Sequence, residues 1–424
     1  MNALTSPYHR LRQTFAPYPA QFELMFWGML ISTIGSSMIW PFLMVYVRQR
    51  IDAPLTVTAS LLTLNSAMSL LASFLGGPVV DRVGRKWIMV ASLAANAFIY
   101  TFMGTADSLA GFAVLLSLFG LVNPLYRVGA DAMMADLIVP AKRIDAYALL
   151  RLSNNLGIAI GPLIGGWLAS ENSALAFYFA AAGMLVYSLL LAARARETLP
   201  QSGAEPPAES PADSARRERL GGYLTVLSDK PFVAFVLNFT LVSICATLIW
   251  VLLPVYATST FQISLNDYKW LPATNALMVV GLQVLVTRRT KRYPGLLMMA
   301  LGAAFYTLAV GGIALGSTWL GFWLCMVVMT IGELVIVPTS SNHVANLAPP
   351  DMRGRYMGLY GMTWGVAAGI GPVFGGLLND RFGPTAIWYG GAAAGATSVL
   401  VFLLMYFRTR SGTVPQPATS EATP

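Results

Sequence analysis

Charged side chains are scarce in this sequence. They make up 11% of its 424 residues, and 56% of the residues are hydrophobic, whereas an average soluble chain is about 25% charged. This deficit argues against a soluble fold. The apolar residues instead run in blocks of about 20, the length of helix that crosses a hydrocarbon core of about 30 Å.

Cysteine and histidine are rarer still, with two residues of each. Cys245 and Cys325 lie inside apolar blocks, so a disulfide framework is excluded and both are expected to pack as small apolar side chains. The sequence has no Cys/His spacing typical of a metal site and no glycine-rich nucleotide loop. It also lacks a catalytic triad. We therefore expect no enzyme activity, no cofactor, no metal and no direct use of ATP.

Twelve apolar blocks are present, and each predicts a membrane-spanning helix. Proline and glycine within such helices are tolerated. The approximate bounds are 22–47, 56–80, 87–104, 109–137, 147–169, 174–193, 231–258, 269–287, 295–315, 317–348, 356–378 and 386–407. The sequence therefore predicts an all-α membrane protein with twelve transmembrane helices.

The formal charge of +8 first suggests a nucleic-acid partner, but the positions of the basic residues argue against one. With the N-terminus placed inside, 21 of the 27 lysines and arginines fall in inner loops and tails, and 4 fall in outer loops. This bias is the positive-inside signature of membrane proteins. We expect no nucleic-acid partner and a multi-pass protein of the plasma (inner) membrane with both termini cytoplasmic.

The blocks form two groups of six. Residues 136–168 and 346–378 align at a constant offset of 210, with ten of 33 positions identical. Six spans return the chain to its starting side, so the two copies have the same orientation, as in transporters whose substrate site lies between parallel halves. The stretch between the groups is rich in Pro, Ser and Glu and cannot bury a core. The predicted parts are a cytoplasmic tail (1–20), an N-terminal six-helix bundle (21–193), a cytoplasmic linker (194–230), a C-terminal six-helix bundle (231–407) and a disordered tail (408–424).

A short charged loop joins the second and third blocks. A glycine there allows close helix approach, and a carboxylate at a helix end can accept from an arginine or from the N-terminus of a facing helix. We predict an inner gate between the halves, in which Asp136 pairs with Arg82 or Arg85; the alternative is a simple positive-inside turn. The candidate loop residues are Gly77, Asp81, Arg82, Gly84, Arg85 and Lys86.

Glycines at a spacing of four mark the fifth predicted span and its repeat. This pattern places small residues on one helix face for close contact, and a proline beside them bends the helix. The candidate residues are Gly157, Gly161, Pro162, Gly165, Gly166, Gly371, Pro372, Gly375 and Gly376. Ordinary tight packing is the alternative to a functional role.

The twelve spans, the repeat and the pattern Gly77-x3-Asp81-Arg82-x-Gly84-Arg85-Lys86 resemble the major facilitator superfamily over roughly residues 20–408. The glycine motif of the fifth span is similar to that of its proton-coupled drug antiporters. Gly332-Glu333, followed by Pro338, resembles several of its proton-coupled multidrug exporters. The resemblance implies that the first, fourth, seventh and tenth helices line a central cavity, and that the glycine surface seals the interface between the halves.

Ionisable residues inside spans are functional candidates, because each costs roughly 2.5–3.5 kcal/mol at the bilayer centre. Glu333 lies near the middle of the tenth span with no base nearby in its own helix, so we predict that it binds and releases a proton. The alternative is a protonated Glu333 bonded to a neighbouring helix. Arg127 and Asp131 share one face of the fourth span. They either neutralise each other or face the cavity, where Arg127 would tune the proton affinity of a carboxylate.

Several aromatic side chains are candidates for the cavity wall, because Met-rich and aromatic surfaces bind lipophilic ligands adaptably. They are Trp40, Tyr126, Trp250 and Trp364; core packing or lipid contact is the alternative for each.

The sequence thus predicts a monomeric secondary transporter that exports lipophilic or amphiphilic small molecules from the bilayer-embedded cavity in exchange for protons. Two alternatives remain. One is a lipid, sugar or other solute transporter on the same fold, and the other is a membrane receptor that does not transport. A cavity with few charges favours lipophilic cargo, whereas many polar side chains would favour sugars or anions.

Overall fold

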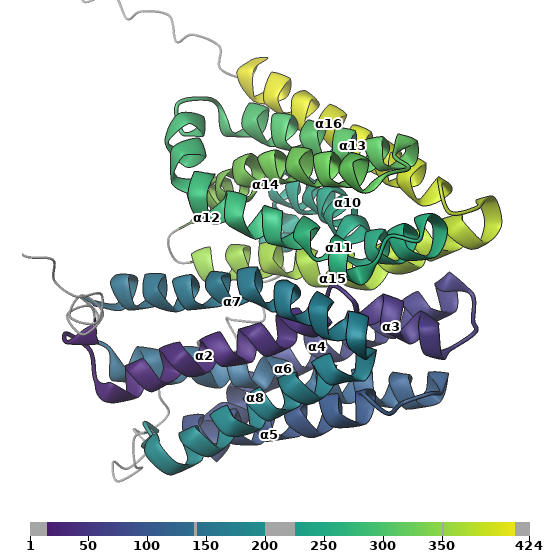
Figure 1. Ribbon diagram of the computed structural model, residues 1–424. Coiled ribbons are helices and arrows are strands. Elements are labelled where there is room, and N and C mark those ends of the chain that lie inside the picture. Colours follow the sequence, from purple (N-terminus) through teal and green to yellow (C-terminus); the bar gives the residue numbers. More distant parts are fainter. Residues whose placement is uncertain (1–14, 140–141, 200–224, 350–351, 412–424) are drawn as a thin grey trace, which may run out of the picture.

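The computed structural model describes residues 15–139, 142–199, 225–349 and 352–411. These residues form helices and contain no strand. Eleven of the helices in the described ranges are long and apolar enough to cross a membrane. Helix α7 (Arg143–Glu171), over the fifth predicted span, is as long but more polar, and it runs beside α2 through the thickness of the bundle (Figure 1). The predicted all-α membrane fold is confirmed.

In the ranges that the structure describes, the N-terminal half contains α7 and six further helices. The predicted block 22–47 is two helices, because Pro41 has no N–H with which to continue the helical hydrogen bonds. The helices are α2 (Ala20–Ile39), α3 (Leu43–Arg50), α4 (Leu55–Val83), α5 (Arg85–Met103), α6 (Leu109–Leu137) and α8 (Ser173–Arg194). They form the purple-to-blue layer in the lower part of Figure 1.

The C-terminal half forms the green-to-yellow upper layer of Figure 1. Its helices are α10 (Lys230–Phe261), α11 (Leu265–Tyr268), α12 (Trp270–Thr290), α13 (Gly295–Leu315), α14 (Trp319–Leu347), α15 (Arg353–Phe382) and α16 (Ala386–Ser411). The predicted block 269–287 corresponds to α12 alone, and the short helix α11 precedes it.

The structure extends the internal repeat beyond the segments that match in sequence. Helices α6 and α14 begin and end at positions that differ by 210. Their caps correspond as well: Ser108 Oγ accepts from Gly111 N–H, and Thr318 Oγ1 accepts from Gly321 N–H, each at 3.2 Å. The same side-chain cap therefore starts the equivalent helix in each half.

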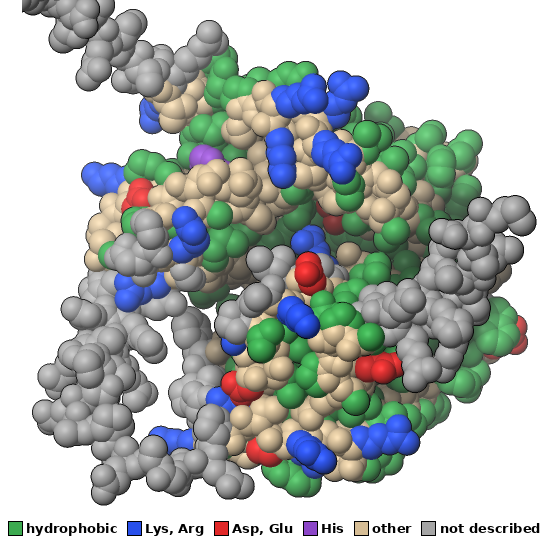
Figure 2. All heavy atoms as spheres, turned by 90° about the vertical axis from the view of Figure 1, so that its left-hand side faces the viewer, with side chains coloured by type: hydrophobic (Ala, Val, Ile, Leu, Met, Phe, Trp, Pro, Cys, Tyr) green, Lys and Arg blue, Asp and Glu red, His purple; other side chains and the backbone are tan. Residues whose placement is uncertain are grey.

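The bundle has two ends. The terminal face is the end at which α2 begins and α16 ends, and the distal face is the opposite end, which carries α3 and α11 (Figure 1). Lysine and arginine side chains are spread over both halves on the terminal face (Figure 2). Residues 1–14, 200–224 and 412–424 of the predicted tails and linker lie outside the described residues.

Candidate functional site

The two halves are in close contact at the distal face and separate toward the terminal face. Along α15, a Cβ on Gly376 would lie 2.7 Å from the Thr56 backbone, and one on Gly365 would lie 3.4 Å from Leu70. Nearer the terminal face, a Cβ on Gly361 or Gly358 would meet nothing within 4 Å. Helices α4 and α15 therefore diverge toward the terminal face.

A cleft opens between the halves where α7 faces α12 and α14. Its volume is about 500 Å³, a typical size for a small-molecule site, and Figure 2 shows the terminal face hollowed between the two layers. The lining mixes apolar and polar side chains: Arg151, Leu152, Asn155, Val279, Val280, Gln283, Thr287, Val337, Pro338 and Ser341.

Glu333 lies one helical turn beyond this lining. Val279 and Val337 line the cleft, and Asn275 and Glu333 precede them by four residues on α12 and α14, about 6 Å further toward the distal face. Asn275 Nδ2 donates to Glu333 Oε2 at 2.7 Å and to Thr330 Oγ1 at 3.0 Å. The acid that the sequence singled out is thus held by a neutral amide from a neighbouring helix, at the inner end of the cleft.

The offset of 210 relates Glu333 and its neighbours to residues at equivalent positions in the other half. Helix α13, which packs on α14, adds Tyr306 to the residues around Glu333, and the two interact electrostatically. The corresponding pairs of positions are Asn65 and Asn275, Asn96 and Tyr306, and Asn123 and Glu333. Sequence reasoning missed Asn275 and Tyr306, although extending the repeat alignment to these helices would have found both.

Arg127 and Asp131 both lie exposed on α6. Within the described residues no ion pair joins them, and Asp131 instead accepts through its backbone oxygen from the Tyr147 hydroxyl at 3.4 Å. The structure does not bring either residue into the hydrogen bonds around Glu333. Their roles in the cavity stay predictions.

The four candidate aromatic residues are not among the residues that line the cleft. Trp40 packs on Phe119, with ring centroids 5.6 Å apart, and Trp364 packs on Phe239 at 6.1 Å. The hydroxyl of Tyr126 lies 3.2 Å from that of Tyr187. Trp250 packs against the larger of two clusters of buried apolar side chains.

The contacts described for the loop between α4 and α5 are with its own half. Gly84 has φ +102° and ψ 151°, a conformation open to glycine, and reverses the chain between the two helices. Arg85 Nε lies 3.1 Å from Asp136 Oδ2, so the predicted pairing of Asp136 is present. Arg82 is exposed and Lys86 lies over the Trp87 ring. Gly77 and Asp81 lie within α4, but their contacts are outside what the structure describes.

Glu197, in the segment after α8, completes this loop and was missed by sequence reasoning. Its carboxylate accepts from the backbone N–H groups of Arg85 and Lys86 at 2.9 and 3.1 Å. Desolvation acts to raise the pKa of Glu197, but backbone hydrogen bonds from Leu199, Thr198, Arg85 and Lys86 outweigh it and lower that pKa. The start of the predicted linker thus caps α5.

The glycine motifs divide their contacts between the two halves. Gly165 packs on α2, where its Cβ would lie 2.2 Å from Met38 O, and Gly375 packs on α10 against Leu252. The next residues face the opposite half: Gly166 contacts Lys269 and Gly376 contacts Thr56. Gly157 and Gly161 also pack on α2, and Gly371 on α10, while Pro162 and Pro372 lie within their helices.

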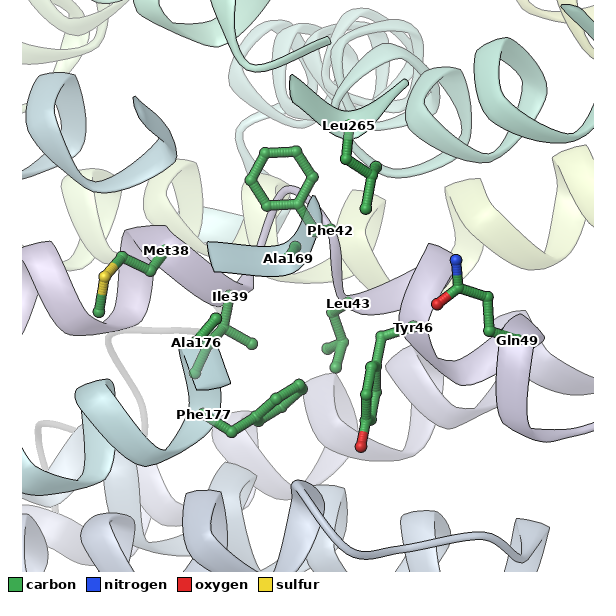
Figure 3. A pocket seen from close by; sticks show the side chains of 10 residues that line it. All are labelled: Met38, Ile39, Phe42, Leu43, Tyr46, Gln49, Ala169, Ala176, Phe177 and Leu265. Carbon is green, nitrogen blue, oxygen red and sulfur yellow. The ribbon is translucent and has the colours of Figure 1, made fainter. Parts of the chain in front are cut away.

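A second pocket lies at the distal ends of α2, α3, α7 and α8. Figure 3 shows Phe177 and Tyr46 beside it, with Leu265 of α11 on its other side. Its volume is about 10 Å³, which is about the space of one water molecule. It is too small to hold a substrate.

Comparisons with known proteins agree with this architecture. The family model described as Major Facilitator Superfamily matches residues 25–258 and 235–424. A Na⁺, Li⁺, K⁺/H⁺ antiporter of Planococcus maritimus is 27% identical over 79% of this chain and 84% of its own length. The multidrug resistance protein MdtH of Enterobacter sp. (strain 638) is 29% identical over 72% of this chain and 73% of its own length. The crystal structure of the nucleoside transporter NupG superposes with a TM-score of 0.77 at 12% identity, covering 91% of this chain and 99% of NupG.

Proposed function

Because the chain belongs to the major facilitator superfamily, we propose that it exports lipophilic or amphiphilic small molecules in exchange for protons, as a monomer in the plasma membrane. The observation that carries this proposal is the position of Glu333. It lies at the inner end of a cleft between the halves and is held by the neutral side chain of Asn275 at 2.7 Å. The relative named as a multidrug resistance protein supports the substrate class.

The proposed cycle uses alternating access. The terminal face, which carries most lysines and arginines, is the cytoplasmic side, so the cleft loads substrate from the cytoplasm or the inner leaflet. Opening at the distal face would let a proton from outside reach Glu333 and displace the substrate. The membrane potential adds about 2.3 kcal/mol per charge for each 100 mV, which is enough to drive export against a gradient.

The test is accumulation of fluorescent amphiphiles, one cationic (ethidium) and one uncharged, in energised inverted vesicles. We expect uptake that collapses with a proton uncoupler and that falls at least about tenfold in Glu333→Gln. The control is Glu23→Gln, which neutralises an exposed acid in the first turn of α2 and should keep wild-type uptake. Full gradient-driven uptake by Glu333→Gln would contradict the assignment.

A second candidate function is exchange of monovalent metal cations for protons. One relative is named as such an antiporter. The Glu333 carboxylate and the Thr330 hydroxyl both accept from Asn275 Nδ2, and these two oxygens are groups that can replace water around such a cation. Alkalinisation of acid-loaded vesicles on addition of NaCl or KCl, without any organic substrate, would favour this function over the first.

A further inference from the structure

The hydroxyl of Tyr306 is buried without a hydrogen-bond partner in the part of the chain that the structure describes. The side chain is 1% exposed and lies on α13 in the core of the C-terminal half. Buried hydroxyls in native proteins almost always have a partner, because leaving one unpaired is costly. The Tyr306 hydroxyl is therefore available to form a hydrogen bond in another state of the protein.

The packing of α13 on α14 places Tyr306 next to Glu333. A Cβ on Gly332 would lie 2.8 Å from Gly302 O and 2.9 Å from the Tyr306 ring, so the two helices approach closely at these glycines. Gly302 precedes Tyr306 by one turn, and Gly332 is adjacent to Glu333. The close approach brings the tyrosine and the carboxylate together, and they interact electrostatically.

The N-terminal half shows what these two positions do when both side chains are short amides. Asn96 and Asn123 correspond to Tyr306 and Glu333 through the offset of 210, and Asn96 Nδ2 donates to Asn123 Oδ1 at 3.3 Å. The register of the third and fourth helices thus allows a side-chain hydrogen bond between them. One half carries a permanent neutral pair, and the other carries a pair that can gain or lose a proton.

The other groups around this pair are neutral. Cys245 on α10 and Tyr360 on α15 interact electrostatically with Tyr306, and Asn275 on α12 contacts Glu333. The Tyr360 hydroxyl lies 2.7 Å from Ser340 Oγ and accepts from Ser341 Oγ at 3.4 Å, and Ser341 lines the cleft. Hydroxyl groups therefore extend from the cleft toward Tyr306.

We propose that Tyr306 is the second hydrogen-bond partner of Glu333 and holds its protonated form. When it is ionised, the carboxylate accepts from Asn275, which is the contact present in the structure. A proton taken up from water in the cleft converts the carboxylate to the acid, which turns and donates its O–H to Tyr306 Oη; loss of that proton returns it to Asn275. Tyr306 keeps its own proton and is a positioning residue. The inference rests on the proposed function, in which Glu333 carries the proton.

Infrared spectroscopy of the full chain in proteoliposomes tests this without a substrate. The Glu333 carboxylic-acid band is identified by its loss in Glu333→Gln, and its disappearance is followed as the pH is raised. In Tyr306→Phe, which keeps the ring packing, we expect the band at higher wavenumber and its midpoint about one pH unit lower, because the acid form has lost one hydrogen bond. The control is Tyr100→Phe, a fully buried tyrosine on α5 whose hydroxyl also has no hydrogen-bond partner among the described residues, and it should change neither.

The outcomes separate the two proposals. A titrating Glu333 band that is the same in wild type and Tyr306→Phe overturns the role of Tyr306 and leaves the proposed function standing. Absence of any titrating Glu333 band in the wild type overturns both. If Tyr306→Phe does not fold, the wild-type tyrosine C–O stretch decides: it should shift together with the carboxyl band and stay constant in Glu333→Gln.

Discussion

Asp380, near the end of α15, accepts a hydrogen bond of 2.9 Å from the backbone N–H of Thr56, at the start of α4. Its other oxygen accepts from Leu55 N–H at 3.2 Å. A carboxylate at a helix N-terminus is worth about 0.3–1 kcal/mol at an exposed site. Because α4 and α15 belong to different halves, this contact stabilises the form that is closed at the distal face.

Asp380→Ala should therefore shift the population toward opening at the distal face, by roughly two- to fivefold for a loss of about 0.3–1 kcal/mol. The measurement is the distance between spin labels on Asp107→Cys and Leu315→Cys, exposed positions on the distal side of opposite halves, in a background with Cys245 and Cys325 replaced. Asp267→Asn is the matched control, since Asp267 accepts from Ser264 within its own half. An unchanged distance distribution in Asp380→Ala would show that the contact does not hold the distal face.

Two glycines of α15 should respond in opposite ways to alanine. Gly376→Ala would place a Cβ 2.7 Å from the Thr56 backbone, so α4 and α15 must move apart, whereas Gly361→Ala meets open space. We expect Gly376→Ala to lower the thermal unfolding temperature in detergent. With the spin labels described above, it should also shift the population toward opening at the distal face. Gly361→Ala should be neutral or stabilising by up to about 1 kcal/mol, because alanine is the better helix former. Equal effects would refute the assignment of Gly376 to the contact between α4 and α15.

The fold was largely predictable because spans of about 20 apolar residues are constrained by bilayer thickness. The observed bounds of α6 and α13 equal the predicted blocks 109–137 and 295–315. The break at Pro41 was not predicted, since proline is often accommodated within a membrane helix. Whether it ends the helix depends on the packing around it.

The site was predicted only in part, for a similar reason. Glu333 stands out in the sequence because an acid within an apolar block is rare. Its partner Asn275 and its neighbour Tyr306 are 58 and 27 positions away along the chain, and neither residue type is unusual in a span. Glu197 was missed because its role depends on a backbone turn at Gly84, which brings the N–H groups of α5 to it.

Glu197 should contribute stability that depends on pH. Its pKa is lowered in the folded protein, chiefly because backbone hydrogen bonds outweigh desolvation. The stabilisation is therefore complete above its ordinary pKa of about 4.3 and is lost as the pH falls through the lowered value. Glu197→Gln should be less stable than wild type at pH 7 by about 0.5 kcal/mol, because an exposed carboxylate is screened.

Chemical denaturation in detergent at pH 7 and near pH 3 measures this difference, which should shrink at the acid end as wild-type Glu197 takes up a proton. Glu171→Gln, at the exposed end of α7, is the control and should show no such pH dependence. A difference that stays constant with pH would mean that the carboxylate charge is not what stabilises the α5 cap.

Asn275 should affect proton coupling only through its contact with Glu333. Asn275→Ala removes the hydrogen bonds of 2.7 Å to Glu333 and 3.0 Å to Thr330, and a hydrogen bond to a charged group is worth about 1.5–3 kcal/mol. We expect gradient-driven accumulation of ethidium in inverted vesicles to fall about tenfold or more, whereas Asn65→Ala, its counterpart in the other half, should retain most activity. In the double variant Asn275→Ala, Glu333→Gln, the loss should equal that of Glu333→Gln alone, because a residue that acts only through Glu333 has nothing left to influence. Additive losses would mean that Asn275 has a separate role, such as direct contact with the substrate.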